Sequence, residues 1–181
     1  MSELVSELRQ TIRDIPDFPK PGIVFKDIAP VLASPELFAR VIDAMAQRVR
    51  AQHPQATHIA GIESRGFIFG APLARALSLP FVLVRKPGKL PGEVVARSYE
   101  LEYGSDALEV QKGAFGPGDH VVVVDDLLAT GGTCEAAVGL IASCGARVVE
   151  ALFLIELSFL QGSERLGSTP VHALVSYEPI T

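Results

Sequence analysis

A run of four valines, Val121 to Val124, constrains the fold of this chain more than any other segment. A strand that is apolar on both of its faces has to be covered on both of them. Strands of this kind are typical of α/β folds, in which helices pack on the two faces of parallel strands. The segment therefore predicts a central parallel sheet flanked by helices.

Other segments of the chain alternate between strand and helix patterns. Strands are predicted at His58–Ile62, Leu79–Val84, Val148–Ile155 and Val171–Val175, and helices at Leu4–Ile12, Phe67–Leu77 and Gly131–Ser143. A further helix should begin at Ser34 and Pro35, because the residues Phe38, Val41, Ile42, Met45 and Val49 follow at helical spacing. Such alternation implies right-handed crossovers, with ligands bound beyond the carboxyl ends of the strands.

Length and charge narrow the possible partners. The 181 residues show no linker or repeat, so we expect one domain over residues 1–181. The formal net charge of −5 disfavours extended contacts with DNA, RNA or anionic lipid. Glu3 and Glu7 stand where a secretory signal would need a basic start, and no apolar run approaches the roughly 20 residues that span a bilayer. We therefore expect a cytoplasmic protein with neither nucleic-acid nor membrane partners.

The two cysteines, Cys134 and Cys144, lie on one predicted helix and its end. At about 1.5 Å of rise per residue they are roughly 15 Å apart, too far for a disulfide. Their spacing to the four histidines does not resemble a zinc site either. We expect reduced, buried thiols.

The string VVVVDDLLATGGT, residues 121–133, carries the most specific chemistry. The strand delivers Asp125 and Asp126 to its carboxyl end, and a short loop then turns into a helix through Ala129, Thr130, Gly131, Gly132 and Thr133. Small residues let the backbone approach a ligand, and the unpaired N–H groups of a helix start point toward it. Each hydrogen bond to a charged group contributes about 1.5–3 kcal/mol, so four or five of them hold a phosphate without any lysine.

Glycines alone would indicate only a turn, but two adjacent aspartates at the end of a buried strand are costly unless something uses them. Two carboxylates beside a phosphate-binding turn suit a sugar phosphate, because the carboxylates can accept hydrogen bonds from its vicinal hydroxyls. The string lacks the Gly-Lys-Ser/Thr of a Walker loop and the GxGxxG of a dinucleotide site. It resembles, without a gap, the motif with which type I phosphoribosyltransferases bind 5-phosphoribosyl 1-pyrophosphate (PRPP). The resemblance implies that residues 129–133 bind the 5′-phosphate and that Asp125 and Asp126 contact the ribose hydroxyls.

A second motif, GIESRGF at Gly61–Phe67, places Arg65 beside the N–H groups of a helix start. Taken alone, it fits a salt-bridged surface arginine equally well. Next to the first motif it resembles the pyrophosphate loop of the same family, which implies that Arg65 holds the leaving group.

The third motif, RKPGKLPGE at Arg85–Glu93, brings Arg85, Lys86 and Lys89 together after a strand. A basic run by itself is usually a solvated loop. Here it precedes a weakly periodic segment, SYELEYG at residues 98–104, and the long polar excursion predicts a flexible lid loop at about 86–106. Both stretches are similar to the closing loop of the adenine-specific members of the family. That similarity implies that Tyr103 seals the site and that Glu102 donates a proton to the base.

Near the N-terminus, DFPKPGIVFKDI at Asp17–Ile28 predicts a rigid turn followed by a short strand that presents Phe25. An aromatic in this position is more often part of a core than a ligand stack. In the adenine-specific members a similar segment forms a hood, about residues 1–30 here. The similarity implies that Phe25 stacks on adenine and that the backbone at Val24 contacts the edge of the base.

The resemblance extends over nearly the whole chain and implies a type I phosphoribosyltransferase fold. It also implies that adenine and PRPP are converted to AMP and pyrophosphate through an oxocarbenium-like state. Mg²⁺ would be bound through PRPP oxygens and not directly by protein side chains. Arg65 and Lys86 would neutralise the departing pyrophosphate, and the family pattern implies a homodimer.

Two other functions remain open. One is a phosphoribosyltransferase for hypoxanthine, guanine or xanthine, although related xanthine enzymes tend to carry Asn-Gly where this chain has Thr130-Gly131 and lack the hood. The other is a PRPP-sensing regulator on the same fold. Repressors of this kind carry an added DNA-binding domain, and only about 17 residues precede the hood motif here. An RNA-binding regulator would carry a basic face, which the net charge of −5 disfavours.

Overall fold

The computed structural model describes residues 2–101 and 104–178. It divides into two compact units, Met1–Ala44 and Met45–Thr181, and each is described by itself. The expectation of one domain over residues 1–181, with a hood at about 1–30 and a lid at about 86–106, stays a prediction.

The first unit contains two short helices, a two-stranded hairpin and the beginning of a long helix. These are α1 (Ser2–Thr11), β1 (Arg13–Pro16), β2 (Val24–Asp27), α2 (Ala29–Leu32) and the start of α3 (Pro35–Gln52). Ion pairs cross the antiparallel hairpin, one from Arg13 to Asp27 and one from Lys26 to Asp14. The predicted start of α3 is confirmed, because the Leu37 N–H donates to Ser34 Oγ at 3.3 Å.

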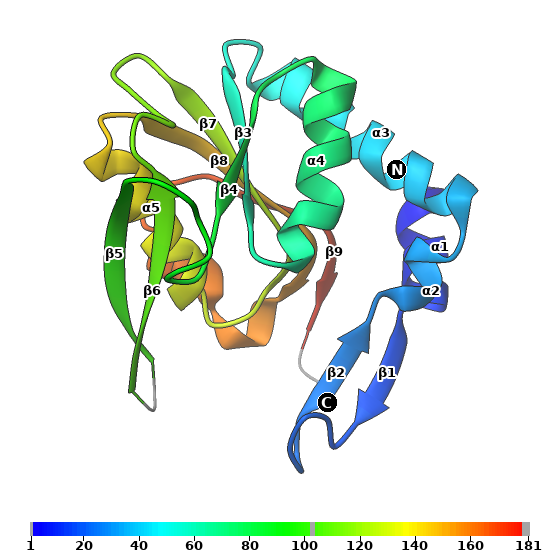
Figure 1. The fold of residues 1–181 in the computed structure, drawn as a ribbon. Coiled ribbons are helices and arrows are strands. Elements are labelled where there is room, and N and C mark those ends of the chain that lie inside the picture. The colour runs from blue at the N-terminus through cyan, green and yellow to red at the C-terminus, as the bar shows by residue number, and fades with distance from the viewer. Residues whose placement is uncertain (1, 102–103, 179–181) are drawn as a thin grey trace. The chain divides into compact units, whose positions relative to one another are not determined.

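The second unit holds the other helices and strands. They are β3 (His58–Ile62), α4 (Arg65–Leu77), β4 (Phe81–Val84), β5 (Val94–Leu101), β6 (Gly104–Gln111), β7 (His120–Leu128), α5 (Gly132–Ser143), β8 (Arg147–Leu157), the 3₁₀ helices η1 (Ser158–Leu160) and η2 (Gly162–Leu166), and β9 (Val171–Tyr177). Five strands form one parallel sheet in the order β4-β3-β7-β8-β9 (Figure 1). The predicted parallel α/β sheet is therefore confirmed.

Helices α4 and α5 lie on opposite faces of this sheet (Figure 1). Val121 and Val123 belong to the apolar core with Leu140 and Ile141 of α5. The alternate residues Val122 and Val124 point to the face that α4 covers. All four valines are fully buried, so the central strand is covered on both sides as the sequence predicts.

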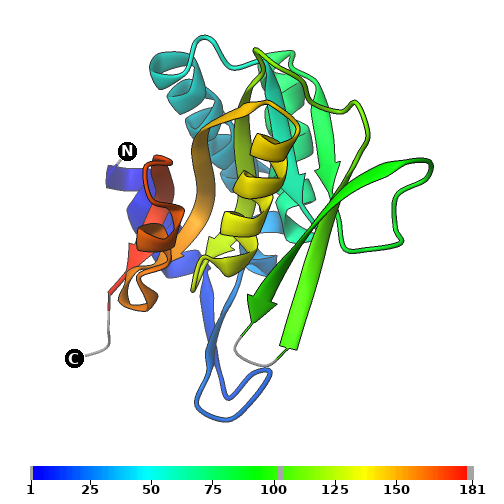
Figure 2. The ribbon, with the colours of Figure 1, turned by 90° about the vertical axis from the view of Figure 1, so that its left-hand side faces the viewer.

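Residues 94–101 and 104–111 pair as the antiparallel strands β5 and β6, where the sequence predicts a loop. The hairpin lies beside α5 in both ribbon views (Figures 1 and 2). Its buried residues Leu108 and Val110 join the core on the α5 face. The strand structure of this segment thus comes from cross-strand pairing and from contact with α5.

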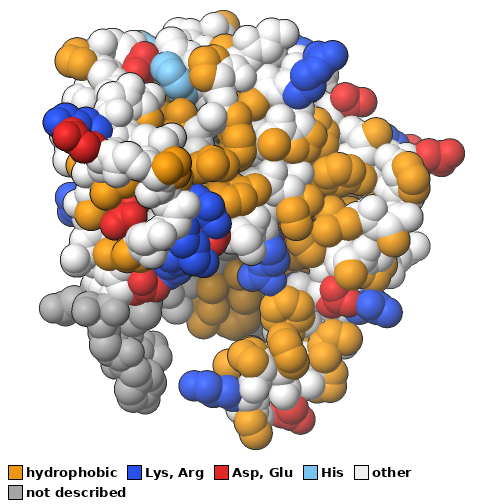
Figure 3. Space-filling view, in the orientation of Figure 1, with side chains coloured by type: hydrophobic (Ala, Val, Ile, Leu, Met, Phe, Trp, Pro, Cys, Tyr) orange, Lys and Arg blue, Asp and Glu red, His pale blue; other side chains and the backbone are white. Residues whose placement is uncertain are grey.

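Acidic and basic side chains are interspersed over the face drawn in Figure 3, and within residues 2–101 and 104–178 no helix has the length and apolar character that crossing a membrane requires. Both cysteines are free; Cys134 is buried, but Cys144 is half-buried, so the expectation of a buried thiol is wrong for Cys144.

Candidate active site

Asp125 and Asp126 lie on β7 itself. The expected strand end at Val124 is wrong, because β7 keeps its pairing with β8 as far as Leu128 opposite Glu156. Successive strand residues point to opposite faces, yet the two aspartates interact, since the Asp126 N–H donates to Asp125 Oδ1 at 2.8 Å. The acid pair is thus part of a rigid strand and not of a loop.

Burial governs the charge of this acid pair. It raises the pKa of Asp125 well above the ordinary 3.8, and the neighbouring charge of Asp126 raises it further. Burial also raises the pKa of Asp126, and the Arg65 guanidinium opposes this rise. Arg65 Nε lies 3.0 Å from Asp126 Oδ2. One cation thus stabilises the ionised form of a carboxylate whose side chain is only 4% exposed.

The start of α4 fits closely against β7. A Cβ on Gly66 would lie 2.6 Å from Val124 O and 3.2 Å from Asp125 Oδ1, so only glycine allows the helix to begin there. This contact brings Arg65, the first residue of α4, next to the acid pair. The helix begins two residues earlier than the predicted Phe67.

After Leu128 the chain turns through residues 129–131 into α5. Gly131 is the N-cap with φ +84°, a left-handed conformation that favours glycine. The first N–H groups of a helix have no acceptor within it, and small residues surround them here. The turn is therefore suited to bind an anion through its backbone.

A cavity of about 280 Å³ joins these groups. Of the residues predicted from the sequence, its lining includes Arg65, Lys86, Asp125, Asp126, Ala129, Thr130, Gly131, Gly132 and Thr133. Glu63, Cys134 and Phe153 also line it, and burial raises the pKa of the Cys134 thiol, so this sulfur stays protonated.

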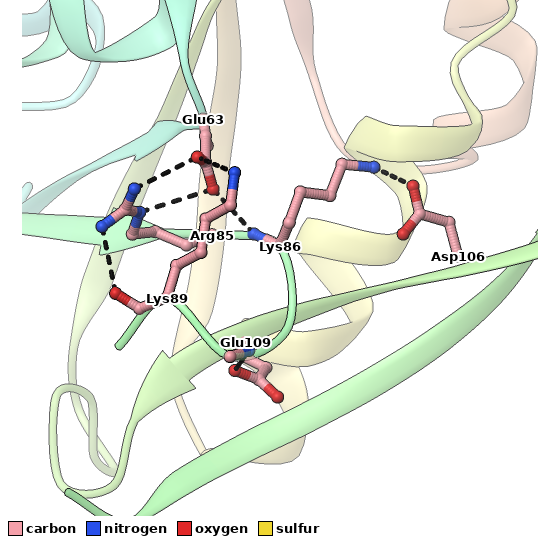
Figure 4. A network of polar contacts seen from close by, with 7 residues as sticks. Glu63, Arg85, Lys86, Lys89, Asp106 and Glu109 are labelled. Carbon is pink, nitrogen blue, oxygen red and sulfur yellow. Dashed lines mark hydrogen bonds and ion pairs between the residues drawn. The ribbon is translucent and has the colours of Figure 1, made fainter. Parts of the chain in front are cut away.

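Glu63, at the end of β3, organises the neighbouring cations (Figure 4). Its carboxylate accepts hydrogen bonds from Arg85, from Lys89 Nζ at 2.8 Å and from the Lys86 N–H at 2.9 Å. Burial alone would raise the pKa of Glu63, but these bonds outweigh it and lower the pKa to about 2. The Arg85 guanidinium also donates to Lys89 O. Arg85 thus holds together the turn at residues 85–89, called the basic turn below.

Lys86 connects the cavity to the hairpin. Its ammonium is paired with Asp106 of β6 (Figure 4) and donates to the Tyr99 hydroxyl of β5 at 2.9 Å. Tyr99 in turn lies 3.5 Å from Thr133 Oγ1. Burial would lower the pKa of Lys86, but the bonds to Asp106 and Tyr99 raise it, so this lysine is a permanent cation.

Sequence reasoning missed three of these polar residues. Glu63 stands inside the GIESRGF motif, but the sequence analysis assigns a role only to Arg65 there. Tyr99 stands inside the SYELEYG segment, and Asp106 comes two residues after its end. A lone acid or tyrosine in such segments carries no signal until the strand pairing Tyr99↔Asp106 places the two opposite each other.

Five predicted site residues are not among the described residues that line this cavity. Arg85 contacts Glu63 of the cavity wall but is not itself part of the lining. Glu102 and Tyr103 lie outside the described residues. Val24 and Phe25 belong to the first unit, where Val24 is exposed and the Phe25 ring meets Phe18 edge-on at 5.1 Å between centroids. Their roles stay predictions.

The comparisons with known proteins agree with one another. Residues 28–165 match the phosphoribosyl transferase domain. The adenine phosphoribosyltransferase of Myxococcus xanthus is 53% identical over 174 residues, which is 96% of this chain and 94% of that protein. The crystal structure of the Thermoanaerobacter pseudethanolicus enzyme of the same name has a TM-score of 0.92 and 48% identity, and covers 96% of this chain and 99% of that one.

The Saccharomyces cerevisiae adenine phosphoribosyltransferase, complexed with an imino-altritol bisphosphate and adenine, has a TM-score of 0.92 and 43% identity, with 96% and 99% of the two chains covered. The acid pair, the glycine-rich turn and the basic turn thus occur in a chain that is similar to these enzymes over nearly its full length. With this sequence, fold and cavity, the chain belongs to the adenine phosphoribosyltransferases, within the phosphoribosyltransferase family.

Proposed function

We propose that the chain forms AMP and pyrophosphate from adenine and PRPP, a reaction of purine salvage, and that the cavity on β7 and α5 is where it occurs. One observation carries the proposal: a buried acid pair and an anion-binding turn lie on one strand–turn–helix unit and line one cavity. The relative from yeast is complexed with an imino-altritol bisphosphate and adenine, that is, with a phosphorylated sugar analogue beside the base that accepts the ribose in the proposed reaction.

The 5′-phosphate binds the turn at residues 129–133. Backbone N–H groups there and the hydroxyls of Thr130 and Thr133 donate to its oxygens, and the helix dipole adds up to about 1 kcal/mol. Held at this end, the ribose extends along β7 toward Asp126.

Asp125 and Asp126 accept hydrogen bonds from the ribose hydroxyls. As the bond to pyrophosphate breaks, positive charge develops on the sugar ring, and two fixed carboxylates in a buried site stabilise it. Their contribution depends on ionisation, which burial opposes and Arg65 favours.

The departing pyrophosphate lies toward Arg65 and Lys86. Both are cations on the cavity wall, and Lys86 also reaches the hairpin through Asp106. Stabilising the leaving group and holding the reactants in line account for most of the rate enhancement in such a displacement.

The acidic wall of the cavity fits a magnesium complex of PRPP. Asp126 keeps Oδ2 buried without an accepted hydrogen bond, at 3.0 Å from Arg65 Nε, so this oxygen faces positive charge. Mg²⁺ is usually held by few protein oxygens together with substrate phosphates. When bound through PRPP, it supplies charge neutralisation at the pyrophosphate. Asp125 and Asp126 would hold it indirectly, through the ribose hydroxyls.

The remaining parts of the proposal rest on the resemblance to the family. Glu102 donates a proton to the purine, Tyr103 closes the site, and Phe25 and the Val24 backbone bind adenine, with Arg85 and Lys89 beside the pyrophosphate. We also propose that the enzyme is a cytoplasmic homodimer. Light scattering of the purified protein tests the dimer.

A turnover assay tests the function. The protein is incubated with PRPP and Mg²⁺ and with adenine, hypoxanthine, guanine or xanthine in turn, and nucleotide formation is measured with and without the metal. We expect AMP formation to exceed every other product and to require Mg²⁺. Faster turnover of hypoxanthine would contradict the adenine specificity, and binding of PRPP without any nucleotide formation would favour a regulator.

A further inference from the structure

The backbone of Gly162 is in close contact with residues 129–131, the turn to which the proposed function assigns the 5′-phosphate. A Cβ on Gly162 would overlap Ala129 O and lie 3.0 Å from Gly131 N, and a Cβ on Gly131 would overlap Gly162 O. These neighbours are main-chain atoms, which cannot swing aside as the end of a side chain can. Two glycines therefore allow a main-chain contact that no other residue pair permits.

The segment that carries Gly162 is itself anchored. Gly162 begins η2, and it is buried. Leu166, at the other end of η2, is 6% exposed and belongs to the core that includes Leu140 and Ile141 of α5. The position of η2 is thus set by the core, and the phosphate-binding turn rests on it.

The same segment brings a charge to the start of α5. Arg165 Nη1 lies 3.5 Å from the point where a Cβ on Gly132 would be, and Arg165 Nε donates to Glu135 Oε2 at 3.1 Å. Glu135 is the acidic residue in the first turn of α5. A carboxylate there repels a phosphate bound at the same helix end, and Arg165 offsets that repulsion.

We propose that η2 positions the 5′-phosphate site from behind. Gly162 sets the place of the main chain at Ala129–Gly131, and Arg165 neutralises Glu135 beside it. Both are positioning residues, because they act through the turn and through Glu135. The inference rests on the proposed function, since it takes residues 129–133 as the site of the phosphate that PRPP and AMP share.

Gly162→Ala is the first test, and Gly116→Ala is its matched control, because a Cβ on Gly116 meets nothing within 4 Å. The forward reaction gives KM for PRPP and adenine, and the reverse reaction gives KM for AMP and pyrophosphate. Only PRPP and AMP carry the 5′-phosphate. We expect Gly162→Ala to raise these two KM values by about tenfold, the effect of one misplaced hydrogen bond to a charged group, and to leave the other two unchanged.

Arg165→Ala is a second test that does not depend on how Gly162→Ala folds, because Arg165 is half-exposed. We expect KM for PRPP and AMP to rise about threefold, the size of one exposed charge pair. Adding Glu135→Gln should restore both values, since it removes the repelling carboxylate. Arg165→Lys should keep them.

Calorimetric titration of AMP into each variant measures the same effect without turnover. If the wild-type protein forms AMP but Gly162→Ala and Arg165→Ala bind AMP and have a KM for PRPP like the wild type, the inference is overturned and the proposed function stands. Equal rises of KM for adenine and pyrophosphate would also overturn it, because they indicate general loosening of the fold. A wild-type protein that makes no AMP contradicts the proposed function, and the titrations then decide the role of η2.

Discussion

Arg65 Nε and Asp126 Oδ2 lie 3.0 Å apart, which joins the residue assigned to pyrophosphate with a residue assigned to ribose. The Asp126 side chain is 4% exposed and that of Arg65 is 43% exposed. Positive charge therefore reaches the buried carboxylate from the solvent side of the cavity. Under the proposed function Arg65 has two tasks as a result: it would contact the leaving group, and it favours the ionised state of Asp126, the acid assigned to the sugar.

Replacing Arg65 should weaken the binding of PRPP and pyrophosphate but not the binding of adenine. We expect Arg65→Ala to raise KM for PRPP and for pyrophosphate by more than about tenfold, because a charged contact is lost. KM for adenine should change little. The control is Arg75→Ala, which removes an exposed arginine from the last turn of the same helix. An equal rise of all three KM values would contradict the assignment to pyrophosphate.

Replacing Asp126 should affect turnover and spare stability. Asp126→Asn removes a charge that burial disfavours, so the melting temperature should stay the same or rise. We expect kcat to fall about 100-fold, the effect typical of losing one preorganised electrostatic group. A variant that unfolds would instead indicate a structural role.

The acid pair should also set the acid side of the pH profile. The pKa of each carboxylate is raised by burial, and only the ionised forms stabilise positive charge, so kcat/KM should rise with pH at values above the ordinary 3.8. Asp126 raises the pKa of Asp125 through its charge. The remaining activity of Asp126→Asn should therefore rise at lower pH than that of the wild type. A profile displaced to higher pH would contradict the coupling.

Glu63 should stabilise the fold in a pH-dependent way. Its pKa falls from 4.5 to about 2 on folding, so between these values the unfolded chain binds more protons and stability rises with pH. The contribution is complete above about 4.5 and is lost as pH falls toward 2. Thermal unfolding of wild type and Glu63→Gln from pH 7 to pH 3 checks this. We expect the wild type to be the more stable at pH 7 and the difference to shrink below the ordinary pKa. A constant difference would show that the carboxylate charge plays no part.

Glu102 should act in the chemical step. If it donates a proton to the purine, Glu102→Leu lowers kcat by about 100-fold or more, the usual size of general acid catalysis. Glu100→Leu is the matched control, because it removes an acid two positions away in the same segment. An unchanged kcat in Glu102→Leu would exclude the residue from proton transfer.

The central sheet and the short strand that carries Phe25 could be predicted from sequence, but β1 and the hairpin of β5 and β6 were not. Val121–Val124 and His58–Ile62 carry their own apolar pattern, and both lie in the sheet as expected. All four residues of β1 are exposed, so they have no such pattern, and the ion pair from Arg13 to Asp27 closes the hairpin instead. In β6 the alternation of the buried residues Leu108 and Val110 does indicate a strand, but the polar residues before them favour a loop.

The candidate site was predictable where one continuous motif carries it. Residues 125–133 lie together because they are neighbours in sequence, and the structure changes only the strand end. The roles of Glu63, Tyr99 and Asp106 depend on partners that are distant in sequence, such as Lys86. Distance in sequence hides such pairs, because each residue alone resembles an ordinary surface group.

The unbroken course of β7 has a consequence for how the chain tolerates change in length. Asp126 and Ala129 are three steps apart, which is about 10 Å at about 3.3 Å per residue, and pairing with β8 keeps this spacing as far as Leu128. Inserting one residue here would turn the following side chains to the other face of the sheet and displace the turn. Insertions are better accommodated at the exposed residues 112 and 113, which begin the connection between β6 and β7. The interval between the proposed sugar and phosphate sites is thus encoded by the number of residues in a strand.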